Sequence, residues 1–210
     1  MSIIYQALLV EGALTKKNKA LLMVGLFAAR REEKEMMHCV ELAVEAGNSV
    51  VEIAELIASA IISRGIPTWL SGIEAIAYAV SLSEESKIHL VSIDEVATFS
   101  SQQECINYYQ TEFEVVPNWI QYLIEYAPDI LLKYSNLRTT SLRDGAVSRL
   151  LKELFLYAIN VCDAYDKGIS IHKSNASALG ANAAMFDEIK ALCIYAVGLK
   201  AIWNDTDRKA

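Results

Sequence analysis

Apolar residues recur at intervals of three or four along almost the whole chain, which is the spacing of one face of an α-helix. In the first half this pattern continues from Leu21 to Val44 and stops at Gly47, a residue that suits the left-handed end of a helix. No segment alternates convincingly between apolar and polar residues at a period of two. We therefore predict an all-α protein with no β-sheet.

Residues that cap or break helices place the expected boundaries. Ser49 is followed by Glu52 in a capping-box pattern, which predicts a helix over residues 50–63. Ser92 and Asp163 are further candidate N-caps. The other helices are expected over residues 69–82, 93–113, 119–126, 147–161, 163–179 and 185–203.

The chain is 53% hydrophobic and its mean hydropathy is +0.25, a high value for a water-soluble protein. A membrane-spanning helix is still not expected, because the longest run without a charged residue, 174–186, has thirteen residues and a span needs about 18. The start of the chain also lacks the features of a signal peptide, so we expect a cytoplasmic protein that does not bind membranes. The apolar excess then predicts surface buried between copies in a homo-oligomer.

The charge balance argues against a nucleic-acid partner. The chain has 26 acidic and 19 basic residues, which gives a net charge of -7. Its only basic cluster, Lys16, Lys17 and Lys19, is short and has no aromatic residue within it for base stacking. Nucleic acid is therefore not an expected partner of this chain.

The four cysteines are far apart in the sequence. They are Cys39, Cys105, Cys162 and Cys193, and no pair of them has the close spacing of a zinc knuckle or a redox C-x-x-C. In a cytoplasmic protein we expect reduced thiols that pack as small apolar side chains.

The two ends of the chain resemble each other when 133 is added to each residue number of the first half. Over residues 14–47 five identities occur without a gap, and both copies continue into a Glu-Ile pair with three extra residues in the second copy. We therefore predict a first repeat over 1–92, a connecting helix over 93–115 and a second repeat over 116–210. The identities are Lys19 with Lys152, Leu21 with Leu154, Lys34 with Lys167, Ala43 with Ala176 and Gly47 with Gly180.

The second half also contains a series of residues in a distinctive order. The series consists of Pro117, Pro128, Gly145, Lys152-Glu153-Leu154, His172, Ala176, Gly180 and Glu188-Ile189. In this order and spacing, residues 117–203 resemble the carboxymuconolactone decarboxylase and alkylhydroperoxidase D (AhpD-like) superfamily. The resemblance implies an AhpD-like helical fold, with two tandem related repeats in one unit and a degenerate copy in the first half.

The chain departs from the family at the two positions of the C-x-x-C motif. In the redox-active branch these thiols open a helix, whose dipole favours the reactive thiolate. This chain has Tyr165 and Gly168 there, so peroxidase activity is not expected. The first half departs further, with Ala20 at the Glu position, Glu32 and Glu35 at the cysteine positions and Cys39 at the His position.

The resemblance leaves Glu153, Tyr165 and His172 as the candidate catalytic residues. A histidine beside a carboxylate can transfer protons near neutral pH, and a phenol can stabilise an enolate. These groups suit a lyase that decarboxylates or isomerises a small cyclic or keto carboxylic acid without a cofactor. Each residue also has a structural interpretation: a packed histidine, a charge at a helix start and a packed aromatic ring.

The first half contains one candidate metal site. Glu32, Glu35 and His38 share a helix face, and Glu-x-x-His occurs in di-iron bundles. The chain has no second Glu-x-x-His, so a solvated charged turn at a helix junction is the simpler interpretation and no metal is expected. Cys39 is interpreted in the same way, as a buried small residue rather than a lone nucleophile.

Three functions follow from these alternatives. The first is the cofactor-free acid/base lyase that uses His172 and Glu153. The second is a non-catalytic oligomeric scaffold or ligand-binding member of the same family. The third is thiol redox chemistry through Cys39 or Cys162. An open cavity that meets Glu153 and His172 would favour the first, and a filled site would favour the second.

Overall fold

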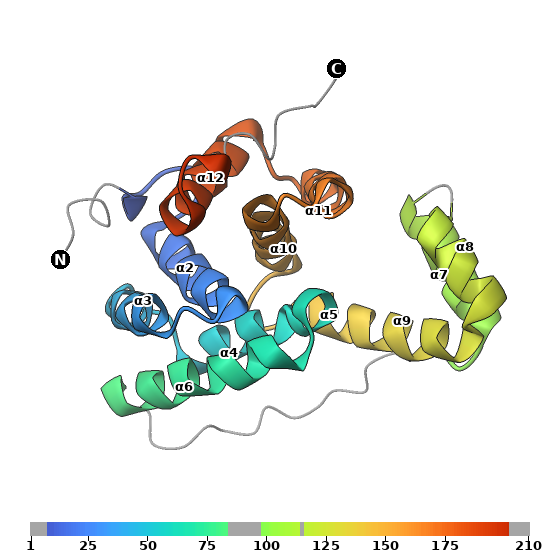
Figure 1. Cartoon of the computed structure of the whole chain (residues 1–210), viewed down its shortest axis with the longest axis horizontal. Helices are drawn as coiled ribbons and strands as arrows, with labels where there is room; N and C mark the ends of the chain where they lie inside the picture. Colours follow the sequence, from blue (N-terminus) through green and yellow to red (C-terminus); the bar gives the residue numbers. More distant parts are fainter. Residues whose placement is uncertain (1–7, 84–97, 114–115, 202–210) are drawn as a thin grey trace. The chain divides into compact units, whose positions relative to one another are not determined.

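The computed structural model describes residues 8–83, 98–113 and 116–201, and every regular element within these ranges is a helix (Figure 1). The prediction of an all-α protein is therefore confirmed. The chain divides into two units. Unit 1 comprises residues 1–88 and 144–210, and unit 2 comprises residues 89–143. No helix within the described ranges is long and apolar enough to cross a membrane.

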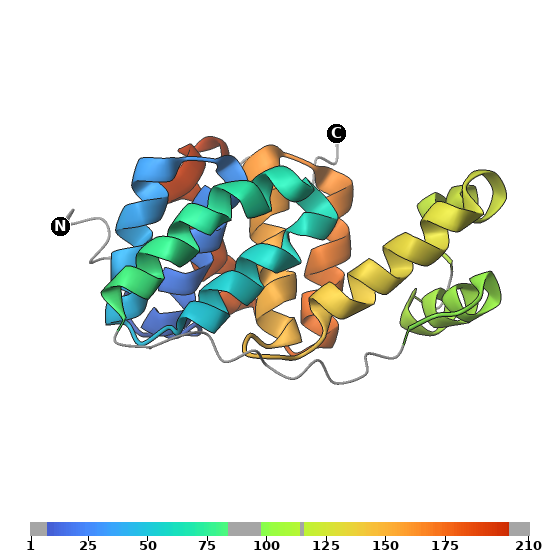
Figure 2. The ribbon, with the colours of Figure 1, turned by 90° about the horizontal axis from the view of Figure 1, so that it is seen from below.

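Unit 1 is built around two buried helices, α2 and α10. Every residue of α2 from Lys19 to Ala28 is buried, and so is every residue of α10 from Leu151 to Cys162. Helices that are buried on all sides must be covered by others. In Figure 1 α3, α4, α6, α11 and α12 surround this pair, and in Figure 2 α6 crosses one face of the unit. The helices are α2 Lys16–Arg30, α3 Glu33–Glu45, α4 Val50–Ser59, α5 Ile61–Arg64, α6 Ile66–Leu82, α10 Arg149–Asp163, α11 Asp166–Ala178 and α12 Ala183–Val197.

Several helix ends in unit 1 lie where the capping residues of the sequence predicted them. The side chain of Ser49 accepts a hydrogen bond from the Glu52 backbone, and Glu52 accepts one from the Ser49 backbone, so the capping box that starts α4 is confirmed. Gly47 has φ +86° in the turn after α3. The predicted turn between two helices in the charged segment is also present, because Arg31 caps α2 in the left-handed conformation.

Asp163 is not the N-cap that the sequence predicted. It is the last residue of α10, which ends because Ala164 takes the left-handed conformation at φ 58° and donates its backbone N–H to carbonyls of α10. Tyr165 then precedes α11 without a capping hydrogen bond from its side chain. The other candidate N-cap, Ser92, lies outside the described residues.

Helix boundaries in unit 1 recur at a numbering offset of 133. The bounds of α2 and α10 differ by that number at both ends, and so do those of α3 and α11. Ser49 and Asn182, the N-caps of α4 and α12, keep the same offset. The three-residue insertion expected in the second half is therefore wrong, and Glu188 corresponds to Glu55.

Unit 2 contains α7 Gln102–Phe113, α8 Asn118–Tyr126 and α9 Pro128–Leu142. Cys105, Tyr109, Ile120 and Leu131 form its buried centre. Burial raises the pKa of Tyr109 to about 12. The helix expected from residue 93 begins at Gln102 within the described residues. The sequence analysis placed no helix at α9, because Pro128 was taken to end the preceding helix, whereas a proline in the first turn begins one.

Candidate active site

Glu153 and His172 lie in direct contact between α10 and α11. Nδ1 of His172 is 2.7 Å from Oε2 of Glu153. The Glu153 side chain is fully buried, and that of His172 is 13% exposed. The two helices pack closely along their lengths, which brings together side chains that are well separated in the sequence. A fully buried carboxylate therefore contacts a nearly buried imidazole in this structure.

Asn175 is a third member of this site that the sequence analysis missed. Its Nδ2 donates to Oε1 of Glu153 at 3.2 Å, so the two carboxylate oxygens of Glu153 face two different side chains. Asn175 follows His172 by three residues, and this spacing places both on one face of α11. The same spacing could have identified Asn175 from the sequence.

This arrangement determines which histidine nitrogen can reach a substrate. The carboxylate of Glu153 accepts a hydrogen bond from Nδ1–H of His172 and so orients the ring. No described side chain is hydrogen-bonded to Nε2 of His172. Nε2 is therefore the ring atom suited to exchange a proton with a bound molecule.

Tyr165 is not joined to this pair. It precedes α11, its side chain is 55% exposed, and no hydrogen bond links it to Glu153 or His172 among the described residues. Gly168, at the second cysteine position, lies against the side chains of Asn160 and Tyr165, and an added Cβ would overlap Oδ1 of Asn160. A glycine at this position lets α11 pack closely on α10.

Glu32 and His38, two members of the candidate metal site, have separate partners in the structure. Glu32 pairs with Arg30 at 2.6 Å, and His38 pairs with Glu41 at 3.3 Å. No group of three metal-ligating side chains occurs within the described residues. The charged-turn interpretation of Glu32 and its neighbours agrees with these pairs.

The four cysteines are buried and form no disulfide among the described residues. Cys162 and Cys193 are hydrogen-bonded to each other, although they lie on different helices, α10 and α12. This hydrogen bond and the charges of Arg30 and Arg64 hold the pKa of Cys162 below its usual value, although burial acts in the opposite direction. Cys39, at the position that corresponds to His172, is fully buried in α3.

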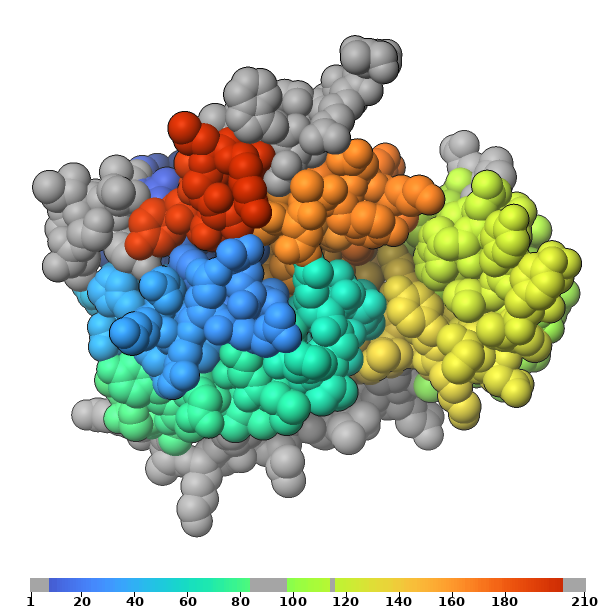
Figure 3. Space-filling model, in the orientation of Figure 1, coloured from blue at the N-terminus to red at the C-terminus, as the bar shows by residue number. Residues whose placement is uncertain are grey.

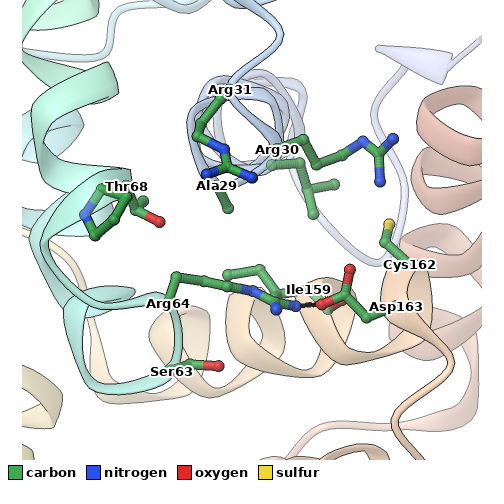
Figure 4. A pocket seen from close by; sticks show the side chains of 11 residues that line it. Ala29, Arg30, Arg31, Ser63, Arg64, Thr68, Ile159, Cys162 and Asp163 are labelled. Atoms are coloured by element: carbon green, nitrogen blue, oxygen red, sulfur yellow. Dashed lines mark hydrogen bonds and ion pairs between the residues drawn. The ribbon is translucent and has the colours of Figure 1, made fainter.

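A cavity of about 380 Å³ lies elsewhere in unit 1 (Figure 4). Neither Glu153 nor His172 is among its lining residues. Cys162 lines it and lies nine residues after Glu153 on α10, which is roughly two and a half helical turns and places the two side chains on opposite sides of the helix.

Comparison with known proteins agrees with the predicted resemblance. Residues 1–78 match the model of the Carboxymuconolactone decarboxylase family, which covers α2 to α5 and most of α6. The sequence analysis had placed the clearer resemblance in the second half. No protein with a curated description matches the chain.

A solved structure has a similar fold. It is a protein of Burkholderia xenovorans LB400 provisionally assigned as a gamma-carboxymuconolactone decarboxylase subunit. The similarity covers 90% of this chain and 77% of that one, with a TM-score of 0.59 and 20% sequence identity. At this identity the similarity concerns the fold. Together with the match over residues 1–78, it confirms the predicted resemblance to the carboxymuconolactone decarboxylase superfamily.

Proposed function

We propose that the protein is a cofactor-free acid/base lyase that acts on a small cyclic or keto carboxylic acid. The observation that carries the proposal is the 2.7 Å contact between Nδ1 of His172 and the fully buried carboxylate of Glu153. A carboxylate in this position fixes the direction of the ring and leaves Nε2 as the nitrogen that can face a substrate. His172 is then the proton donor and acceptor, and Glu153 is its positioning residue.

The chemistry needs only a proton donor at the end of the reaction. When a β-keto acid loses carbon dioxide, the bond between the α-carbon and the carboxylate breaks and its electron pair moves to the carbonyl as an enolate. Protonation of that α-carbon by Nε2 of His172 completes the reaction. In an isomerisation the same nitrogen removes a proton from one carbon and returns it to another.

The role of Tyr165 in this proposal is secondary. A phenol could stabilise the enolate oxygen, but the Tyr165 side chain is 55% exposed and lies outside the hydrogen-bonded pair. We therefore expect Tyr165→Phe to lower turnover by less than about fivefold. A larger loss would place the phenol in the reaction.

The test is the release of carbon dioxide from a panel of small β-keto acids and carboxylated lactones. We expect at least one compound to be turned over, and His172→Ala to reduce the rate by about a hundredfold or more. Lys167→Ala, an exposed charge on the same helix, is the matched control and should keep the wild-type rate. The proposal fails if no compound reacts or if His172→Ala reacts as fast as the wild type.

A non-catalytic role is the second candidate, and one observation favours it. The described cavity does not meet Glu153 or His172, although a substrate must reach Nε2. In this alternative the protein binds a ligand or serves as a scaffold, and the pair only stabilises α10 against α11. The panel separates the two functions, because a ligand-binding protein gives no turnover with any compound.

We also propose that the two halves of unit 1 are related copies. The recurring helix bounds support this, as do the left-handed residues Arg31 and Ala164 at the same offset of 133. Only the second half has the acid/base residues, since Ala20 and Cys39 occupy the corresponding positions in the first. One active site per chain follows from this proposal.

We also propose that the protein assembles as a homo-oligomer and that it is cytoplasmic. A homo-oligomer is supported by a row of exposed apolar residues on α6, which lies on the surface of the unit in Figure 3. The cytoplasm is supported by the four cysteines, which form no disulfide among the described residues, because oxidising compartments favour disulfides. We retain both as parts of the proposed function.

A further inference from the structure

The cavity of about 380 Å³ in unit 1 is surrounded by arginines. Arg30 and Arg31 come from the end of α2, and Arg64 comes from the end of α5. Figure 4 shows Arg31 on one side of the cavity and Arg64 on the other, with Thr68 at one end and Cys162 at the opposite end. Arginine guanidinium groups are always charged and match the geometry of carboxylates.

The positive charge of this cavity is only partly neutralised. Arg64 pairs with Asp163, another lining residue, and also donates to the carbonyl of Ile159 at 3.4 Å. Arg30 pairs with Glu32 at 2.6 Å, but its buried Nε has no hydrogen-bond partner. No ion pair of Arg31 occurs among the described residues. The cavity therefore presents more positive than negative charge to its contents.

The rest of the lining is largely apolar. Leu26 and Ala29 of α2, Pro67 of α6 and Ile159 of α10 contribute hydrocarbon surface, so one part of the cavity suits an apolar group and another suits an anion. A volume of about 380 Å³ lies within the range of small-molecule sites. Inorganic anions would leave the apolar walls without a partner.

We infer that this cavity binds a small organic carboxylate, with the carboxylate between Arg31 and Arg64 and the apolar body against Leu26 and Ile159. The site is separate from the proposed active site, because Cys162 and Glu153 point to opposite sides of α10. It does not depend on the proposed lyase activity. Asp163 competes with the ligand for Arg64.

Isothermal titration calorimetry of the full chain with cyclohexanecarboxylate tests this inference. We expect saturable binding with a Kd on the order of 1 mM or lower. Cyclohexanecarboxamide, which has the same body and no charge, should give no saturable heat. Inorganic phosphate and chloride should bind at least about tenfold more weakly than cyclohexanecarboxylate.

Four variants locate the binding. Arg31→Asn removes the unpaired charge and keeps a residue that tolerates the left-handed conformation, so the Kd should rise about tenfold or more. Lys34→Gln removes an exposed charge outside the cavity and should change the Kd by less than about twofold. Asp163→Asn frees Arg64 and should lower the Kd by roughly threefold or more. His172→Ala should bind as the wild type does.

Three results would overturn the inference. The first is the absence of heat with cyclohexanecarboxylate up to about 10 mM, and the second is equally strong binding of phosphate. The third is weaker binding in His172→Ala with unchanged binding in Arg31→Asn, which would place the probe at the proposed active site. A variant that loses turnover but still binds cyclohexanecarboxylate, or that loses binding but keeps turnover, distinguishes this inference from the lyase proposal.

Discussion

At the scale of single residues, the buried carboxylate of Glu153 receives hydrogen bonds from His172 and Asn175. We predict that His172→Ala lowers the free energy of unfolding by about 1–3 kcal/mol, because it removes a donor from a buried charged group. His172→Gln should lose less stability, since the amide can still donate. Urea unfolding measures both.

The same two variants separate a structural from a catalytic histidine. A glutamine cannot exchange a proton at neutral pH, so His172→Gln should have no turnover even where its fold is stable. If His172→Gln kept the wild-type rate, the ring would be structural.

Glu188 gives a pH-dependent prediction. Burial acts to raise the pKa of Glu188, but its pKa lies below the usual 4.5. The charged form is stabilised by the backbone N–H of Leu14, the Lys19 ammonium and the backbone N–H of Ala13. A lowered folded-state pKa contributes stability above pH 4.5 that is lost as the pH falls below it. Glu188→Gln should therefore cost about 1–2 kcal/mol at neutral pH.

Urea unfolding of Glu188→Gln and the wild type at neutral and acid pH measures this dependence. The difference between them should shrink as the pH falls below 4.5. Asp187→Asn, at the exposed neighbouring position, is the control and should show little effect. A difference that stays constant into acid would contradict the assigned direction.

At the scale of helices, two ion pairs link the first and second halves of unit 1. In one pair the first half provides the lysine and the second half the glutamate, and in the other pair these roles are exchanged. Lys19 of α2 pairs with Glu188 of α12 at 3.0 Å, and Lys152 of α10 pairs with Glu55 of α4 at 2.6 Å. Glu188 also accepts hydrogen bonds from the backbone N–H groups of Ala13 and Leu14, just before α2, and Glu55 accepts one from that of Ala146, just before α10. These paired contacts occur at the same numbering offset that relates the helices.

Gly145 tests this packing. An added Cβ at Gly145 would overlap Oε1 of Glu55, so we predict that Gly145→Ala displaces the carboxylate and costs about 1–3 kcal/mol. In a Glu55→Ala background the same substitution should cost less than about 0.5 kcal/mol. Thermal or urea unfolding of the wild type, the two single variants and the double variant measures both costs. An equal loss of stability from Gly145→Ala in both backgrounds would contradict the proposed contact with Glu55.

The sequence predicted the features that local chemistry decides. The capping box at Ser49, the left-handed Gly47 and the helical periodicity depend on near neighbours. The positions of charged side chains depend on distant partners, so the buried Lys152 and its pairing with Glu55 of a distant helix were not predicted. The closeness of Glu153 and His172 came from the family resemblance, because their spacing alone does not place two helices side by side.

At the scale of the whole molecule, the exposed apolar row on α6 predicts self-association. Ile66, Leu70, Ile73 and Val80 are 41–59% exposed and recur at helical spacing on one side of α6. We predict that Leu70→Lys shifts the protein toward the monomer. Sedimentation velocity measures the shift, with Leu179→Lys, just after α11, as an exposed control. A wild-type monomer would contradict this prediction.

The central claim is that His172 delivers the proton to the substrate carbon, and product formed in deuterium oxide tests it most directly. With a compound that reacts in the panel, the account predicts one deuterium at the α-carbon, on a single face, because a fixed imidazole protonates a bound enolate. His172→Ala should form this product far more slowly. Deuterium on both faces, or the same rate and stereochemistry in His172→Ala, would contradict the claim.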